Sequence, residues 1–421
     1  MKAKARYNYR LRLRTAEAAK LQAVFSACRA VWNQALGRWV ELHREEGLSY
    51  RYGDADKELT DWRSAWPWLA GQPSVPEQQV LRDLFKSIAA FFDKANPAGR
   101  PRFKSRKAGY ATARWTTNGF SVSGSGLGRR ADRLEVAVAG GRLPLRVVWS
   151  RPLPSAPTSV TVRRDKAGHW WASFVVEVEL PEAPTCPTGR TTGLDMGLST
   201  FATAEDEAAD VANPRFARRV ATALARSQRN VARAQKGSKG RAKAKKRLAA
   251  ASAKVADQRR DFQHKAARGL LGAYDVVGVE DLQVKNMSRR AKLARNTKRG
   301  KSGRCKAGLN RSIADAGWRQ FLSVLSWQAA KAGKRVMVLP AGGTTQRCSS
   351  CGARAKPRVE LSDRVFRCGC CGLVLGRDRN AARNLNPGRA PGPAGWAVPA
   401  RGAPGGDDGS KPSVLASAGA A

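Results

Sequence analysis

The stretch CSSCGARAKPRVELSDRVFRCGCCGLVLGRDRNAARNL, residues 348–385, is the most informative segment for predicting the fold. It contains two Cys-x2-Cys pairs, separated by 16 residues, whose members are Cys348, Cys351, Cys368 and Cys371. Each pair turns the chain so that both sulfurs face one point, and two such pairs are typical of a structural zinc ribbon. We therefore predict that these four thiolates bind Zn²⁺ and that Cys370, inside the second pair, points away.

A single acid, Asp378, follows the last of these cysteines and opens a predicted helix, RNAARNL. Two more acids lie on predicted strands: Asp195 in TTGLDMGLSTFATA and Glu280 at the end of the apolar run DVVGVE. A charged side chain on a buried strand is costly unless it is paired or bound to a cation. The three carboxylates therefore predict a site for Mg²⁺ or Mn²⁺, where two cations could activate water and stabilise the leaving oxygen of a phosphodiester.

Each acid also has a purely structural explanation. Asp195 could cap a turn, Asp378 could be a helix N-cap, and Glu280 could pair with an arginine. Their placement on successive elements of one predicted sheet favours the shared site.

The net charge indicates the class of partner. The chain has 421 residues, with 77 Lys and Arg against 33 Asp and Glu, which gives a formal net charge of +44. Such an excess repels itself unless a polyanion neutralises it, so nucleic acid is the expected partner. A membrane partner is not expected, because no apolar run approaches the roughly 18 to 20 residues that a span requires. The amino terminus lacks the apolar region of a secretory signal, and the cysteine usage suits a reducing cytoplasm.

In the first half of the chain, the spacing of the apolar residues changes its period twice. Residues 7–13 alternate like a strand, residues 15 to about 95 have helical spacing, and residues 134–180 alternate again. We predict a small antiparallel barrel with a helical block inserted after its first strand. Ser74 and Glu77 predict a capping box within that block.

A basic segment, GRPRFKSRKAGYATARW (residues 99–115), joins the helical block to the barrel. Its aromatic residues Phe103, Tyr110 and Trp115 favour a flexible arm that contacts phosphates and stacks on bases. The alternative is a solvated loop whose aromatics pack into the nearest core.

The second half alternates strands and helices. Two strands in residues 191–204 precede a basic helical hairpin from Asn213, and a buried strand covers residues 275–282. A mobile basic loop (289–306), a helix (313–332) and a last strand (334–339) follow. This order predicts an α/β sheet with mixed strand direction. The segment after Pro387 is rich in Pro and Gly and predicts a disordered tail.

These segments together resemble a known family. LDMGLSTFAT, VVGVEDLQVKNM, GLNRSIADAGWRQFLSVLSWQAAKAGKRV and the two cysteine pairs followed by RDRNAARNL resemble the three RuvC-type segments and zinc ribbon of the TnpB (OrfB) proteins of bacterial insertion sequences. Those proteins are relatives of compact type V CRISPR effectors. The amino-terminal RYNYRLRLRTAE, PRFKSR, WSRPLP and DQRRDFQHK also fit, so the resemblance spans about residues 1 to 387.

The resemblance implies a multidomain α/β fold, in which a RuvC (RNase H-like) mixed sheet with an inserted zinc ribbon follows a wedge β-barrel carrying a helical insertion. The expected boundaries are 1–14 for the first barrel strand, 15–114 for the helical recognition block and basic arm, 115–183 for the barrel, 186–345 for the first part of the nuclease, 346–371 for the ribbon, 372–387 for the last nuclease motif and 388–421 for the tail.

The resemblance also implies an activity. The family binds a guide RNA encoded at the transposon end and cuts double-stranded DNA that matches the guide beside a short motif. Asp195, Glu280 and Asp378 match its catalytic, Mg²⁺-binding acids, and the four cysteines match its zinc ligands. Gly376 stands where the family often has another aspartate, but no catalytic acid is lost, so we expect activity. The expected location is the bacterial cytoplasm, in association with the nucleoid.

Two other functions fit the same composition. One is a transposase or recombinase that acts directly on transposon ends, since a three-acid site of this type can transfer strands without a tyrosine or serine nucleophile. The other is a non-enzymatic zinc-ribbon regulator that binds DNA through the same basic surface.

Overall fold

The computed structural model describes residues 1–44, 47–95, 98–106, 111–124, 127–181, 187–289, 301–360 and 362–389. The chain divides into two compact units, with the boundary in the sequence at Glu179. The predicted disordered tail lies almost wholly outside the described residues, as do residues 290–300 of the predicted basic loop.

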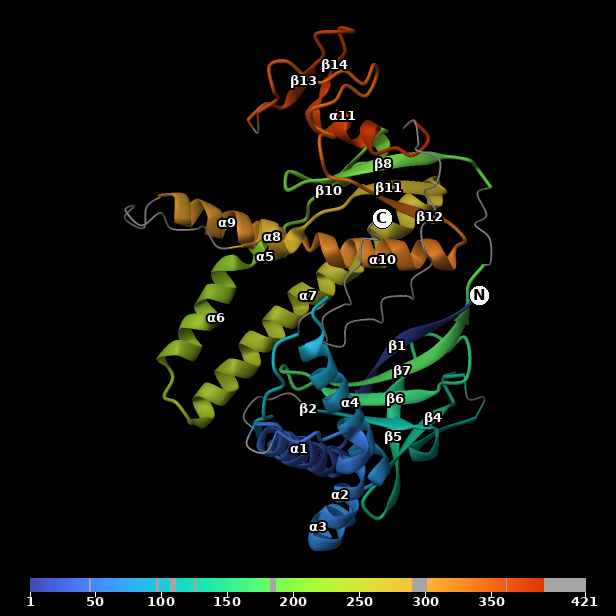
Figure 1. Cartoon of the computed structure of the whole chain (residues 1–421), viewed down its shortest axis with the longest axis vertical. Coiled ribbons are helices and arrows are strands. Elements are labelled where there is room, and N and C mark those ends of the chain that lie inside the picture. The colour runs from blue at the N-terminus through green and yellow to red at the C-terminus, as the bar shows by residue number, and fades with distance from the viewer. Residues whose placement is uncertain are drawn as a thin grey trace. The chain divides into compact units, whose positions relative to one another are not determined.

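The first unit is built on a seven-stranded sheet that closes almost into a barrel, as the alternating pattern predicts (Figure 1). Its strands follow the spatial order β2-β6-β7-β1-β5-β4-β3. In chain order they are β1 (Lys2–Arg12), β2 (Ala111–Thr116), β3 (Phe120–Ser123), β4 (Arg133–Val138), β5 (Gly141–Val148), β6 (Ser159–Arg164) and β7 (Trp170–Glu179). The first strand of the chain thus lies between two late strands, which confirms that the helical block is an insertion.

Four helices form this insertion: α1 (Thr15–Arg44), α2 (Tyr52–Ala65), α3 (Pro67–Ala70) and α4 (Ser74–Phe92). The predicted capping box at the start of α4 is wrong. Pro73 is the N-cap residue and no side chain caps the helix. Glu77 is instead fully buried and forms an ion pair with Arg63 of α2, because tertiary packing turns its carboxylate inward.

The basic segment after α4 is held against α1 over residues 102–104. The indole of Trp32 donates to the carbonyl of Arg102 (3.0 Å), and the amide of Asn33 exchanges two hydrogen bonds with the backbone of Lys104 (2.7 and 3.0 Å). Phe103 between them is 60% exposed. Trp115 does not belong to this surface: it lies on β2, is fully buried in the barrel, and was wrongly assigned to the arm. Tyr110 lies outside the described residues.

The second unit contains a five-stranded sheet of order β10-β9-β8-β11-β12. Its strands are β8 (Thr191–Met196), β9 (Thr200–Ala204), β10 (Val211–Ala212), β11 (Val276–Glu280) and β12 (Arg335–Leu339). Strand β11 pairs in parallel with β8 and β12, whereas β9 pairs antiparallel with both β8 and β10. The predicted mixed sheet is therefore confirmed; the short strand β10 was not predicted.

The helices of this unit are α5 (Phe216–Arg219), α6 (Ala221–Arg233), α7 (Lys239–Ala273), α8 (Val284–Met287), α9 (Lys301–Ala316), α10 (Trp318–Lys331) and α11 (Arg377–Asn384). Figure 1 shows α10 on one side of the sheet and α11 on the other. Strands β13 (Val365–Arg367) and β14 (Val374–Gly376) form a small hairpin beside α11.

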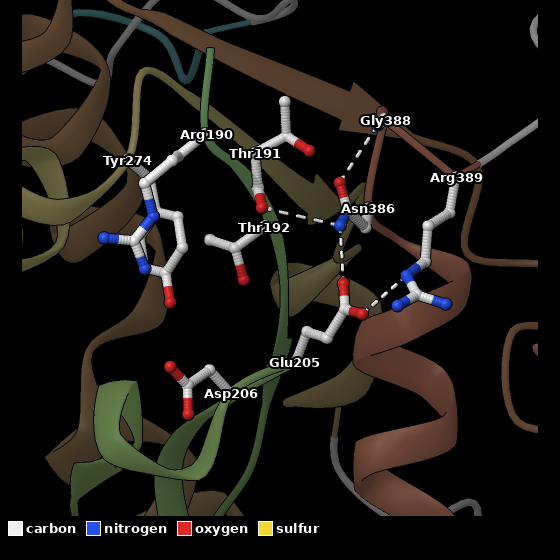
Figure 2. A pocket seen from close by; sticks show the side chains of 9 residues that line it. All are labelled: Arg190, Thr191, Thr192, Glu205, Asp206, Tyr274, Asn386, Gly388 and Arg389. Carbon is white, nitrogen blue, oxygen red and sulfur yellow. Dashed lines mark hydrogen bonds and ion pairs between the residues drawn. The ribbon is translucent and has the colours of Figure 1, made fainter. Parts of the chain in front are cut away.

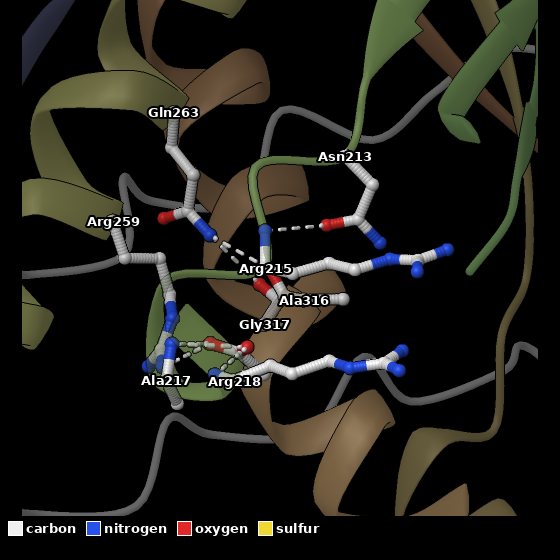
Figure 3. A network of polar contacts seen from close by, with 9 residues as sticks. Asn213, Arg215, Ala217, Arg218, Arg259, Gln263, Ala316 and Gly317 are labelled. Atoms are coloured by element: carbon white, nitrogen blue, oxygen red, sulfur yellow. Dashed lines mark hydrogen bonds and ion pairs between the residues drawn. The ribbon is translucent and has the colours of Figure 1, made fainter. Parts of the chain in front are cut away.

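Two helices, α9 and α10, replace the single helix predicted for residues 313–332, and α9 begins inside the predicted loop. The break is at Gly317, whose φ of 66° is the left-handed conformation that favours glycine. Just before it, Asp315 accepts hydrogen bonds from the backbone N–H groups of Ala217 (2.9 and 3.0 Å) and Arg218 (3.3 Å), and pairs with Arg259 (3.2 Å) (Figure 3). Contacts with α5 and α7, which lie far away in the sequence, thus hold the chain next to this break.

Candidate metal and catalytic centre

The four predicted zinc ligands come together in the second unit. The sulfurs of Cys348, Cys351, Cys368 and Cys371 all lie within 4.8 Å of one another. The Sγ atoms of Cys348 and Cys371 are 3.6 Å apart, and those of Cys351 and Cys368 are 3.5 Å apart. Thiolates at about 2.3 Å from a tetrahedral zinc ion have this kind of spacing.

The cluster is suited to a structural zinc ion. Four thiolates fill the tetrahedral shell and leave no open position for water or substrate. Phe366 of β13 is fully buried beside Cys348 and Cys368, so the ribbon has a small core of its own. Cys370 is exposed and outside the cluster, as predicted.

Helix α11 lies directly on the sheet because two glycines make room for it. Gly193 of β8 and Gly278 of β11 are register partners. A Cβ atom built on Gly193 would lie 2.0 Å from the carbonyl oxygen of Ala382, and one on Gly278 would lie 1.8 Å from that of Leu385. Any side chain at either glycine would therefore push the end of α11 away from the sheet.

The same close packing brings the three predicted acids to one face. Side chains alternate along a strand, so Asp195 lies on the same face as Gly193, and Glu280 on the same face as Gly278. On α11, Asp378 is four residues before Ala382 and thus on the helix side that contacts the sheet. The opposite face of the strands carries the buried apolar side chains that pack with α7 and α10: Leu194, Met196, Val277 and Val279.

The three carboxylates are close enough for their charges to influence one another. The pKa of Asp195 is raised to about 7, mainly by burial and also by the charges of Asp378 and Glu280. Arg377 opposes this shift. Burial also raises the pKa of Glu280, although a hydrogen bond from the hydroxyl of Thr344 (3.2 Å) partly offsets it.

The acids converge without closing around one point. Among the residues that the structure describes, the four cysteines are the only group of three or more His, Cys, Asp or Glu side chains whose ligand atoms all lie within 4.8 Å of one another. Asp378 is turned partly to Arg377, whose Nη2 lies 3.2 Å from its Oδ1. The donor set nevertheless fits a hard divalent cation, since oxygen ligands of like charge on one face repel each other until a cation neutralises them.

A polar pocket of about 390 Å³ lies near the starting ends of strands β8 and β11 (Figure 2). Its lining includes Thr191 at the start of β8 and Tyr274 just before β11, whereas the acids lie at the opposite ends of these strands. Asn386 in this pocket donates to the carboxylate of Glu205 (2.5 Å), which also pairs with Arg389 (2.5 Å). These bonds fasten the chain after α11 to the sheet.

Sequence reasoning missed three residues of the centre: Thr344, Arg377 and Asn380. Thr344 contacts Glu280, and Arg377 contacts Asp378. Asn380 is fully buried and bonded to the ribbon. The only available signal was that Arg377 and Asn380 stand within two residues of a candidate acid.

Taken together, the fold and the site define a class: RuvC-like proteins with an inserted four-cysteine ribbon. Within that class, the chain belongs to the TnpB (OrfB) family. Residues 173–291 match the profile of OrfB proteins of the IS605 type, described as "Probable transposase", and residues 318–385 match the "Cas12f1-like, TNB domain".

Two relatives match over 387 residues, or 91% of this chain. A protein of Streptomyces pristinaespiralis named "Putative RNA-guided DNA endonuclease" is 33% identical and covered over 88% of its length. "Putative RNA-guided DNA endonuclease InsQ" of Escherichia coli K12 is 32% identical and covered over 92%. The fold is similar to that in "Cryo-EM structure of the Cas12f1-sgRNA-target DNA complex", with a TM-score of 0.55 and 12% identity over 89% of this chain and 82% of that chain.

A third profile, described as "Helix-turn-helix domain", matches residues 1–47. In the structure this region contains strand β1 and the long helix α1. In none of the described parts of the chain is a helix both long and apolar enough to cross a membrane.

Proposed function

We propose that this protein is an RNA-guided DNA endonuclease that hydrolyses phosphodiester bonds of guide-matched DNA at Asp195, Glu280 and Asp378. The observation that carries the proposal is the convergence of these acids on the α11 face of the sheet, in a chain that matches two proteins named as such endonucleases over most of both lengths.

The chain's own residues would hold the divalent cations as follows. Asp195 interacts electrostatically with both other acids, which makes it the natural shared ligand. Thr344 orients the carboxylate of Glu280, and Arg377 holds that of Asp378 until a cation competes for it. Mg²⁺ or Mn²⁺, when bound, supplies an activated water and stabilises the leaving oxygen.

The partners follow from charge and from the relatives. A net charge of +44 suits a protein that grips the backbones of a guide RNA and a target DNA while base pairing reads the sequence. The exposed Phe103, held between Arg102 and Lys104 by the contacts with α1, is placed to stack on a base. With these partners, the protein would act in the bacterial cytoplasm, at the nucleoid.

The decisive experiment asks whether RNA directs the cut. The protein is purified from cells that carry its element, the bound RNA is sequenced, and the guide portion is then replaced by an unrelated sequence. We expect the cut in double-stranded DNA to move to the new matching site in Mg²⁺. RNA-bound protein that ignores the new guide, or binds DNA without cutting in Mg²⁺ or Mn²⁺, would contradict the proposal and favour a regulator.

One observation favours a second function. The profile that covers residues 173–291 is described as "Probable transposase". A transposase would join transposon ends to target DNA with no RNA present, so strand transfer by RNA-free protein would support this alternative.

A further inference from the structure

Helix α11 is bonded to the zinc ribbon through a buried asparagine. The side chain of Asn380 is fully buried. Its Oδ1 accepts a hydrogen bond from the backbone N–H of Ser349 (2.9 Å), and its Nδ2 donates to the carbonyl of Arg347 (2.7 Å). These two backbone groups stand on either side of Cys348, so one amide grips the peptide groups that flank a zinc ligand.

A second asparagine extends the contact by one helical turn. The Nδ2 of Asn384 donates to the carbonyls of Arg347 (2.8 Å) and Thr344 (2.8 Å). The hydroxyl of Thr344 in turn donates to the carboxylate of Glu280 (3.2 Å). Hydrogen bonds thus connect Asn384 of α11 to Glu280 through Thr344.

The same helix leads to a second acid. Asp378 stands two residues before Asn380, within the first turn of α11. Because a short helix moves as one body, any displacement of Asn380 also displaces Asp378 relative to Asp195. The position of the first cysteine pair and the position of two acids are therefore mechanically linked.

We propose that Asn380 is a positioning residue that couples zinc binding in the ribbon to divalent-cation binding at the three acids. Zinc fixes Cys348 and hence the peptide groups of Arg347 and Ser349. Asn380 satisfies both of its polar ends on those groups, as a buried amide requires, and so holds α11 in register with the sheet. Only the last step, cation binding by the acids, rests on the proposed function.

The first test measures zinc retention in the full-length protein. A chelator is added to zinc-loaded protein and the rate of zinc release is followed. Mutation of a residue that orients metal ligands typically lowers metal affinity by about 10- to 100-fold. The Asn380→Ala protein should therefore release zinc faster by about that factor. Release at the wild-type rate would overturn the proposal.

A matched control is available at the other end of the same helix. Asn386, two residues after the end of α11, is also buried and also holds this part of the chain to the sheet, but its side chain bonds to Glu205, Thr191 and Gly388 and not to the ribbon (Figure 2). Asn386→Ala should keep the wild-type rate of zinc release. Equal acceleration in both variants would mean that Asn380 only stabilises the helix, and would overturn the coupling.

The second test needs no variant, so a failure of Asn380→Ala to fold does not affect it. Zinc is stripped from the wild-type protein, and Mn²⁺ binding is measured by electron paramagnetic resonance together with hydrogen exchange of the α11 amides. We expect Mn²⁺ affinity to fall by about tenfold or more and exchange in α11 to increase. Unchanged affinity and exchange would overturn the proposal.

The two proposals can fail separately. The assigned acid site is wrong if zinc-loaded wild-type protein does not bind Mn²⁺, or if Asp195→Ala leaves its Mn²⁺ binding unchanged. The zinc-release and hydrogen-exchange results would still decide whether Asn380 links the ribbon to α11.

Discussion

The two candidate metal sites of the second unit differ in how they are assembled. All four cysteines come from two tight knuckles, and their sulfurs already lie within 4.8 Å of one another. The three acids come from β8, β11 and α11, and their oxygens form no such group. The ribbon site is therefore set by local chain turns, whereas the acid site depends on how a helix packs on a sheet.

Buried acids also differ between the two units. Glu77 in the helical block is fully buried, but Arg63 lies against it as a counter-ion. Asp195 instead faces two further acids. A buried carboxylate that already has its own counter-ion is neutralised within the fold, while one beside other carboxylates has to be neutralised by a proton or by a cation from solution. This contrast supports the proposal that the acids bind a cation.

The largest expected effect comes from removing an acid. Asp195→Ala should lower guided cleavage by about 10³-fold or more, because a metal at this position supplies several kcal/mol of transition-state stabilisation. Bound RNA and zinc content should not change. Cleavage is measured on guide-matched plasmid DNA in Mg²⁺.

The matched control for the acids is Asp281, which is exposed and next to Glu280 in sequence. Its carboxylate accepts hydrogen bonds from the side-chain amide of Gln283 (3.3 Å). Glu280→Ala should abolish cleavage while Asp281→Ala keeps it. Equal losses in both variants would argue against a specific role for Glu280.

The next effect breaks the ribbon. Cys351→Ser should lose zinc, since binding by four thiolates contributes on the order of 10 kcal/mol to a structural site. Cys370 lies between the two ligands of the second pair but is not one of the four clustered cysteines, so Cys370→Ser should keep a full zinc equivalent. Metal content of the purified proteins is the measurement. Zinc loss from the Cys370 variant would show that the ligand set is misassigned.

The sequence predicted best what local spacing determines. The cysteine pairs have a fixed separation, and the apolar strand patterns around Asp195 and Glu280 place both acids on strands. It failed where a distant contact decides. Contacts of Asp315 with α5 hold the chain at the break beside Gly317, and Trp115 is buried because it lies on β2 and faces the barrel core. The link made by Asn380 joins residues about 30 positions apart, which no local pattern records.

A smaller effect tests whether helix packing alone assembles the acids. Gly278→Ala would place a Cβ atom 1.8 Å from the carbonyl oxygen of Leu385 and displace α11. A shift of about 1 Å in a catalytic group can lower the rate by about 10²-fold, so cleavage should fall by that order while zinc stays bound. Gly272→Ala on α7, which meets no atom within 4 Å, is the control and should keep activity. Full activity of the Gly278 variant would refute the packing argument.

The smallest effect concerns the acid that already has a counter-ion. Burial is the main cause that raises the pKa of Glu77 from 4.5 to about 7, and Arg63 opposes the shift. Because the folded-state pKa lies above the unfolded one, the stability contribution is complete below pH 4.5 and is lost as the pH rises to about 7, up to about 3 kcal/mol. Glu77→Gln should remove this pH dependence from the unfolding of the full chain, whereas Glu41→Gln, at an exposed site, should not. Mg²⁺ should leave this pH dependence of stability unchanged, because a carboxylate paired with arginine offers no vacant site to a cation. A pH dependence that shifts with Mg²⁺ would contradict the distinction between the two kinds of buried acid.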